Sequence, residues 1–303
     1  MKRSVVAFTF LLSGWAQGTE PVDIDSSYQN LQKAVADKDA AQVKKLAVET
    51  NQAARAVIAS PAPTGDAEKD TWTKQVAYAK EVAAYTEFAL YNASTQAKAE
   101  DAVDLLGTLE KENPKSKYLD EGYLYYFKVL TETGQAAKIP AIAEKAIANF
   151  PGNDDLLLIL CTSAFEHKQY DRAATLGTRL VAAASKRPKP EGISGAEWEK
   201  KKNTELGQGY YMAGMSHAGK NQFTLANKEL RSALPLIQST PTIHGAALFE
   251  LGVVNYQIGK MTLNKGQIAE AAKFSEQAAA ISGPWQDQAK RNAQLMLAEA
   301  KGR

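Results

Sequence analysis

The residues that could do chemistry in this sequence begin with two adjacent carboxylates, Asp154 and Asp155. Neighbouring carboxylates can share acid and base roles in catalysis, or they can bind a cation. This pair stands where an apolar helical segment is expected to begin, and acidic residues in the first turn of a helix complement its free N–H groups and its dipole. We therefore interpret Asp154 and Asp155 as capping residues.

The cysteine and the histidines are the next candidates. Cys161 could act as a nucleophile, but we expect it to lie between two packed helices, where it serves as an inert small apolar residue. His167, His217 and His244 are widely separated, with no cysteine or carboxylate at the spacing of metal ligands. The sequence therefore predicts no metal site, and we interpret His217 as a buried or half-buried structural residue.

A glycine-rich stretch could suggest a nucleotide cofactor. The segment "GQGYYMAG" is similar to a dinucleotide-binding fingerprint, but its third glycine is missing and no strand precedes it. The sequence also contains no Walker motif, no nucleophile elbow and no His-Glu-x-x-His motif. We therefore expect no catalytic residues and no cofactor, which favours a protein that is not an enzyme.

A locally basic segment could bind phosphate groups. Its basic residues are Lys186, Arg187, Lys189, Lys200, Lys201 and Lys202. Acidic residues are interleaved with them at Glu191, Glu197 and Glu199. Mixed charge of this kind is typical of a solvated loop, so we interpret the segment as a loop and not as an anion site.

The helices that must carry these residues are visible in the periodicity. Apolar residues recur at steps of three and four from Tyr28 to Leu297, whereas the alternating Val-rich and Thr-rich runs of strands are missing. Hydrophobic residues make up 45% of the 303 residues, which is enough for a sizeable core. The sequence predicts an all-α protein.

The N-terminus has the three-part layout of a secretory signal peptide. Two basic residues precede an apolar run over residues 5–12, and small residues and a polar stretch follow. The apolar run is shorter than the ~20 residues of a membrane-spanning helix, so an uncleaved anchor is the less favoured alternative. We expect residues 1–18 to be a signal peptide, cleaved after Ala16 or Gly18, and the protein to be exported, either periplasmic or secreted.

Charge limits the kinds of partner. Loss of Lys2 and Arg3 with the signal peptide leaves 34 basic and 34 acidic residues in the mature chain. A neutral protein lacks the excess positive charge with which proteins bind nucleic acids or anionic membranes non-specifically. We therefore expect no nucleic-acid partner and no stable membrane insertion.

Small residues recur at fixed positions within the helical pattern. In "YYMAGMSHAGKNQFTLANKELRSAL", a 34-residue frame with Gly214 at position 8 has Phe223 at 17, Ala226 at 20, Leu230 at 24 and Ala233 at 27. This pattern resembles the tetratricopeptide repeat, a pair of antiparallel helices with small residues at 8, 20 and 27 and an aromatic residue near 17. The frame predicts that Gly214 and Ala226 face each other where the two helices cross.

The same frame fits other stretches. Cys161 at position 8 is followed by Tyr170 at 17 and Ala173 at 20, and it stands 34 residues after Phe127, the position-8 residue of the preceding unit. That unit also has Gly134 at position 15. Phe127 departs from the family pattern, since a small residue is expected there.

The last unit and the insertion before the third unit are less regular. Gly252 and Gly259 take positions 8 and 15, and the second helix of that unit follows after an insertion. An earlier insertion covers residues 181–204, and Ser194 with Glu197 has the spacing of a capping box, which predicts a short extra helix.

These patterns divide the chain into four parts. The resemblance is weaker before residue 115, and we interpret residues 26–59 as a degenerate helical hairpin that turns at 37–39. The expected parts are a signal peptide (1–18), an N-terminal helical hairpin with its linker (19–66), tetratricopeptide-like repeats (67–283, with the insertion 181–204) and a C-terminal capping helix (284–303).

The resemblance implies a right-handed superhelix of helical hairpins with a concave binding wall. Members of this family typically use that wall, formed by the first helix of each pair, to hold a peptide or a partner helix. The positions that line it in the family correspond here to Leu158, Thr162, Phe165, Tyr211, Met215, Phe249, Val253, Tyr256 and Gln257. The same positions often pack neighbouring repeats together, so these residues are either a groove or part of the core.

The expected function is that of an exported, non-enzymatic scaffold that binds a protein or peptide partner of unknown identity. One alternative is an accessory subunit of envelope assembly or secretion machinery, bound permanently to one partner. The other is an enzyme or a carbohydrate-binding protein, which would require carboxylates and aromatic residues converging in one pocket.

Overall fold

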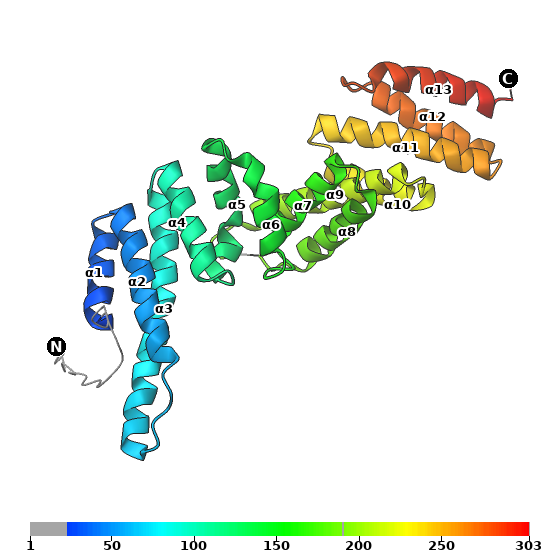
Figure 1. Cartoon of the computed structure of the whole chain (residues 1–303). Coiled ribbons are helices and arrows are strands. Elements are labelled where there is room, and N and C mark those ends of the chain that lie inside the picture. Colours follow the sequence, from blue (N-terminus) through cyan, green and yellow to red (C-terminus); the bar gives the residue numbers. More distant parts are fainter. Residues whose placement is uncertain (1–22, 190, 303) are drawn as a thin grey trace. The chain divides into compact units, whose positions relative to one another are not determined.

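The computed structural model describes residues 23–189 and 191–302, and these residues form thirteen α-helices and two short 3-10 helices, without strands (Figure 1). The expected all-α class is confirmed. The signal peptide expected at residues 1–18 lies outside the described residues. The chain divides after Glu112 into two compact units, and each is described by itself.

The first unit contains two pairs of helices. They are α1 (Ile24–Ala36), α2 (Ala40–Ile58), α3 (Asp66–Gln96) and α4 (Ala99–Glu112). The hairpin expected over residues 26–59 is confirmed by α1 and α2, which pack against each other and are joined by a turn at 37–39. The side chains of Asp23 and Asp39 accept hydrogen bonds from free N–H groups at the starts of α1 and α2.

The elements of the second unit are α5 (Lys117–Glu132), η1 (Ala136–Lys138), α6 (Ile139–Ala146), α7 (Asp154–Glu166), α8 (Tyr170–Lys186), α9 (Gly195–Gly219), α10 (Phe223–Ala233), η2 (Leu234–Leu236), α11 (Pro241–Met261), α12 (Lys265–Ala279) and α13 (Gln286–Ala300). In this unit, each α-helix from α6 onwards contacts the next one. The C-terminal segment expected to be helical is α13, which packs on α12.

One turn geometry recurs in five places. The second residue after each of α1, α5, α7, α9 and α11 has a positive φ between 53° and 71°. The next residue donates its N–H to the carbonyl five residues earlier, for example Gln169 to Ala164 at 2.8 Å and Asn264 to Gly259 at 2.9 Å. This is the Schellman motif, which satisfies the last free carbonyls of a helix. The hairpins of both units therefore turn in the same way.

At these five turns the residues with positive φ are Lys38, Gly134, Lys168, Asn221 and Leu263. Only one of them is glycine, the residue that adopts this conformation without steric cost. Leu263 is the least suited of the five, and its side chain is 89% exposed, so packing offsets little of the backbone cost.

We expect Leu263→Gly to stabilise the protein by about 0.5–1 kcal/mol, because glycine relieves the strain at positive φ and no buried contact is lost. Urea denaturation followed by circular dichroism measures the change. Gly134→Ala, at the matching position of the α5 turn, is expected to destabilise by a similar amount. A destabilised Leu263→Gly variant would contradict this account of the turn.

The last hairpin shows where the expected insertion lies. The frame has Gly259 at position 15, with an insertion before the second helix. In the structure α11 continues through Gly259 to Met261, and the turn residue is Leu263, four residues later. The extra residues therefore lengthen the first helix of this hairpin by about one turn. Gly259 instead lets α12 approach, since a Cβ atom there would lie 2.7 Å from Ile268.

The insertion at residues 181–204 also differs from expectation. Ser194 and Glu197 form the expected capping box, with the side chain of each bonded to the backbone N–H of the other. The helix that they start is not a short extra helix, because it runs without interruption to Gly219. The second half of the insertion is therefore an N-terminal extension of α9.

Candidate functional site

The nine residues expected to line a groove lie on the first helices of three successive hairpins, α7, α9 and α11. These helices are neighbours, since α7 contacts α9 and α9 contacts α11. All nine side chains are half-buried, so none is wholly enclosed and none projects freely into solvent. We call this set of nine residues the first-helix wall.

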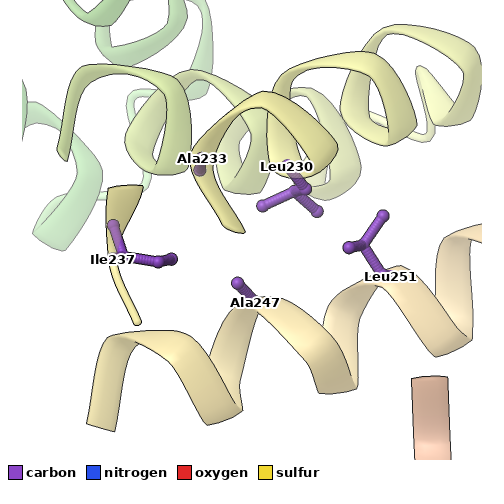
Figure 2. Close-up of a cluster of buried hydrophobic side chains, with 5 residues drawn as sticks. All are labelled: Leu230, Ala233, Ile237, Ala247 and Leu251. Carbon is purple, nitrogen blue, oxygen red and sulfur yellow. The ribbon is translucent and has the colours of Figure 1, made fainter. Parts of the chain in front are cut away.

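Tyr211 and Met215 of the wall pack against an apolar cluster, whose five buried members are labelled in Figure 2. The cluster consists of Leu230 and Ala233 of α10, Ile237 after η2, and Ala247 and Leu251 of α11, and all five are buried. These two residues of α9 therefore help to hold α9 and α10 against α11. Part of each side chain also remains accessible.

Phe249 and Tyr256 of the wall pack towards the C-terminal end of the unit. Phe249 contacts the cluster around Trp285, whereas Tyr256 contacts a cluster around Ile268 and Met296. The Tyr256 hydroxyl donates a hydrogen bond of 2.7 Å to Glu299 of α13. Phe165 also packs between helices, since its ring centre lies 6.0 Å from that of Tyr170 in α8, so five of the nine residues contribute to packing between helices.

A carboxylate that the sequence analysis did not single out lies beside the wall. Burial raises the pKa of Glu250 in α11 above its ordinary value. Burial and the nearby charge of Glu250 also raise the pKa of Tyr211. Glu250 directly follows the wall residue Phe249. The sequence pattern gave no sign of it, because Glu250 has no paired carboxylate nearby in the sequence and its neighbour Tyr211 belongs to another helix.

A second group of polar residues gathers where α7, the end of α8 and α9 meet. Asp154 has only 2% of its surface exposed, and the Arg187 guanidinium bonds both of its carboxylate oxygens. The Arg187 guanidinium also lies over the ring of buried Trp198, 6.0 Å from its centre. We call Asp154, Asp155, Arg187, Lys201 and Glu205 the charged cluster.

Two interpretations from the sequence need correction here. The side-chain cap of α7 is Asn153, which accepts from the N–H of Leu156, whereas Asp154 makes a buried ion pair. Arg187 is not part of a solvated loop, because it is half-buried against Asp154 and Trp198. Both errors arise because Asp154 and Arg187 stand 33 residues apart and only packing brings them together.

Glu205 completes the charged cluster from α9. Its side chain is buried, and Lys201 lies 3.5 Å from one of its carboxylate oxygens. Burial and the neighbouring charge of Asp154 raise the pKa of Glu205 to about 7. Burial is the strongest influence on Asp154 and acts to raise its pKa, but the hydrogen bonds from Arg187 and Glu205 and the charges of Arg187 and Lys201 together outweigh it, so the pKa is lowered.

The cysteine lies as the sequence predicts. Cys161 is buried between α7 and α8, where its thiol donates to the carbonyl of Ala173 at 3.3 Å. Burial raises the pKa of this thiol to about 12. The thiolate form is therefore disfavoured at neutral pH, as expected for an inert packing residue.

The histidines do not come together. His217 is half-buried, and its Nδ1 lies 2.7 Å from the side-chain oxygen of Gln222. His167 lies on the exposed end of α7 with its Nδ1 2.7 Å from the carbonyl of Ser163, and burial lowers the pKa of His244 in α11. Each has its own local environment on a different helix.

None of the helices within residues 23–189 and 191–302 is long and apolar enough to cross a membrane.

Comparisons with known proteins add no family assignment. No protein-family model matches the chain, and no curated protein matches it either.

Proposed function

We propose that this protein is an exported, non-enzymatic scaffold, a solenoid of tetratricopeptide-like hairpins that binds a protein or peptide partner along the first-helix wall. The observation that supports it most is the succession of half-buried, mainly apolar residues on α7, α9 and α11, three neighbouring first helices. A continuous apolar surface on rigid helices suits an apolar helix or an extended segment as ligand.

The wall contains positions that can be tested without disturbing the core. Thr162 on α7 and Gln257 on α11 are half-buried polar members of it. Thr175 on α8 and Gln277 on α12 are exposed residues of second helices and serve as matched controls. The two wall positions lie on first helices, and the two control positions lie on second helices of the same hairpins.

A photo-crosslinking amino acid placed at Thr162 or Gln257 is expected to capture the same partner polypeptide, because both positions line one wall. The same label at Thr175 or Gln277 is expected to capture none. Mass spectrometry of crosslinked species from cells identifies the partner. Equal capture from both helix types, or capture from the controls alone, would show that binding does not use the wall.

A charge substitution provides an independent measurement. Thr162→Arg is expected to weaken binding of the identified partner by about tenfold or more, because it places an unpaired charge in an apolar interface. Thr175→Arg is expected to leave binding unchanged. Thermal midpoints of both variants should stay close to that of the unmodified protein, since neither residue is buried.

Export is proposed from the layout of residues 1–18. A fusion of residues 1–22 to an enzyme that is active only outside the cytoplasm is expected to show activity. N-terminal sequencing of the mature protein is expected to begin near Gln17 or Thr19. Recovery of the full chain from the cytoplasm with Met1 intact argues against export.

A further inference from the structure

The charged cluster contains one more negative charge than positive charge when all its groups are ionised. Asp154 and Asp155 come from α7, Glu205 and Lys201 from α9, and Arg187 from the end of α8. One oxygen from each of the three carboxylates lies within 4.8 Å of the others. A further carboxylate, Asp120 of α5, also acts electrostatically on Asp155.

The positive charges do not reach every carboxylate oxygen. Arg187 bonds both oxygens of Asp154, and Lys201 lies beside one oxygen of Glu205. The other oxygen of Glu205, Oε2, is buried without a hydrogen-bond donor. A buried carboxylate oxygen without a donor is costly, whereas a protonated carboxyl group can donate to a neighbouring carboxylate and removes one charge.

The cluster also attaches a segment that has few other buried contacts. Among the described residues of 187–204, which we call the insertion segment, Trp198 is the single buried side chain. Arg187 and Lys201 belong to this segment, and Glu205 directly follows it. Its attachment to the rest of the unit therefore depends on Trp198, which lies under Arg187, and on the ion pairs and hydrogen bonds of the charged cluster.

We propose that Glu205 and Asp154 share a proton that holds the insertion segment against α7, and that loss of this proton above neutral pH releases the segment. When Glu205 is protonated, its carboxyl group donates a hydrogen bond to the Asp154 carboxylate. Arg187 and Lys201 then balance the negative charges of Asp154 and Asp155. After deprotonation, the buried carboxylates of Asp154 and Glu205 and the half-buried carboxylate of Asp155 repel one another with only two cations beside them.

The direction of the pH effect follows from linkage. The pKa of Glu205 rises from 4.5 to about 7 on folding, so its stabilising contribution is complete below pH 4.5 and is lost as the pH rises through 7. The pKa of Asp154 is lowered from 3.8, so its contribution is lost only as the pH falls through the acid range. The segment is therefore held most firmly in mildly acidic solution.

Hydrogen exchange of the full chain tests the proposal. Protection factors correct for the intrinsic pH dependence of exchange, and those of amides in residues 195–204 are expected to fall on the order of tenfold between pH 5.5 and pH 8. Amides of α12, which lies away from the charged cluster, are expected to keep their protection. Unchanged protection of residues 195–204 across this range would overturn the proposal.

Two variants and a direct titration complete the test. Glu205→Gln keeps a neutral donor at this position and is expected to retain high protection at both pH values, whereas Glu199→Gln, an exposed change in the same segment, should retain the pH dependence of the unmodified protein. Carboxyl ¹³C NMR of labelled glutamate is expected to show one glutamate titrating near pH 7, absent in Glu205→Gln. An ordinary pKa for Glu205 would rule the switch out even if the variants fold poorly.

Discussion

Replacing Trp285 with alanine is expected to destabilise the protein by about 3–5 kcal/mol, the range for loss of a large buried aromatic side chain. Trp285 is 8% exposed and packs in a cluster with Leu248 of α11, Ala278 of α12 and Ala289 of α13. Alanine would leave a cavity where these three helices meet. Urea denaturation followed by circular dichroism measures the loss.

The space for the Trp285 ring comes from two glycines. A Cβ atom at either Gly245 or Gly283 would lie 2.3 Å from the ring, so the ring occupies the volume that a side chain would need. Its indole N–H is buried without an acceptor. Trp285→Phe therefore loses no hydrogen bond and is expected to cost much less than Trp285→Ala.

Leu295→Ala is a control on α13, because Leu295 is 58% exposed and should change stability little. If Trp285→Ala and Leu295→Ala had equal effects, α13 would not be held by the Trp285 cluster. Equal costs for Trp285→Phe and Trp285→Ala would show that a phenyl ring restores none of the packing of the indole ring.

Gly214→Leu is expected to destabilise by roughly 1–3 kcal/mol through overpacking. A Cβ atom at Gly214 would lie 2.6 Å from Leu230 Cγ and 3.0 Å from the Leu230 backbone nitrogen. The side chain of Leu230 can move, but its backbone cannot unless α10 separates from α9. The measurement is again the free energy of unfolding in urea.

Gly195→Leu is the matched control for this substitution. Gly195 begins the same helix, and a Cβ atom there would meet no atom within 4 Å. The same chemical change is therefore expected to be near neutral at Gly195, since leucine has the higher helix propensity. Similar costs at the two glycines would mean that the effect at Gly214 is not steric.

The geometry at Gly214 also corrects the sequence interpretation of the crossing. The closest atoms belong to Leu230 at position 24, not to Ala226 at position 20. Ala226 is fully buried, but it packs in a cluster with Ala218 and Val254, the latter on α11. Position 8 (Gly214) is small because α10 crosses α9 there. Position 20 (Ala226) is small because α11, the first helix of the next hairpin, also packs against it.

Local patterns determined much of the architecture. The apolar periodicity predicted an all-helical chain, and the spacing of Ser194 and Glu197 predicted the start of α9. The turn position at 37–39 was also readable. These features depend on interactions within one or two helical turns, which a single stretch of sequence contains in full. The length of α11 was not readable, because no local signal shows that the helix continues past Gly259.

Only the tertiary structure decided which side chains meet across helices. Asp154 and Arg187 carry ordinary local signals, those of a helix start and of a basic loop, yet they form a buried pair beside Glu205. Likewise, the repeat frame identified Tyr211 and Tyr256 as wall residues, but their packing on the next helices follows from the neighbours placed there. Burial and charge pairing depend on the relative positions of helices, so periodicity and caps alone do not determine them.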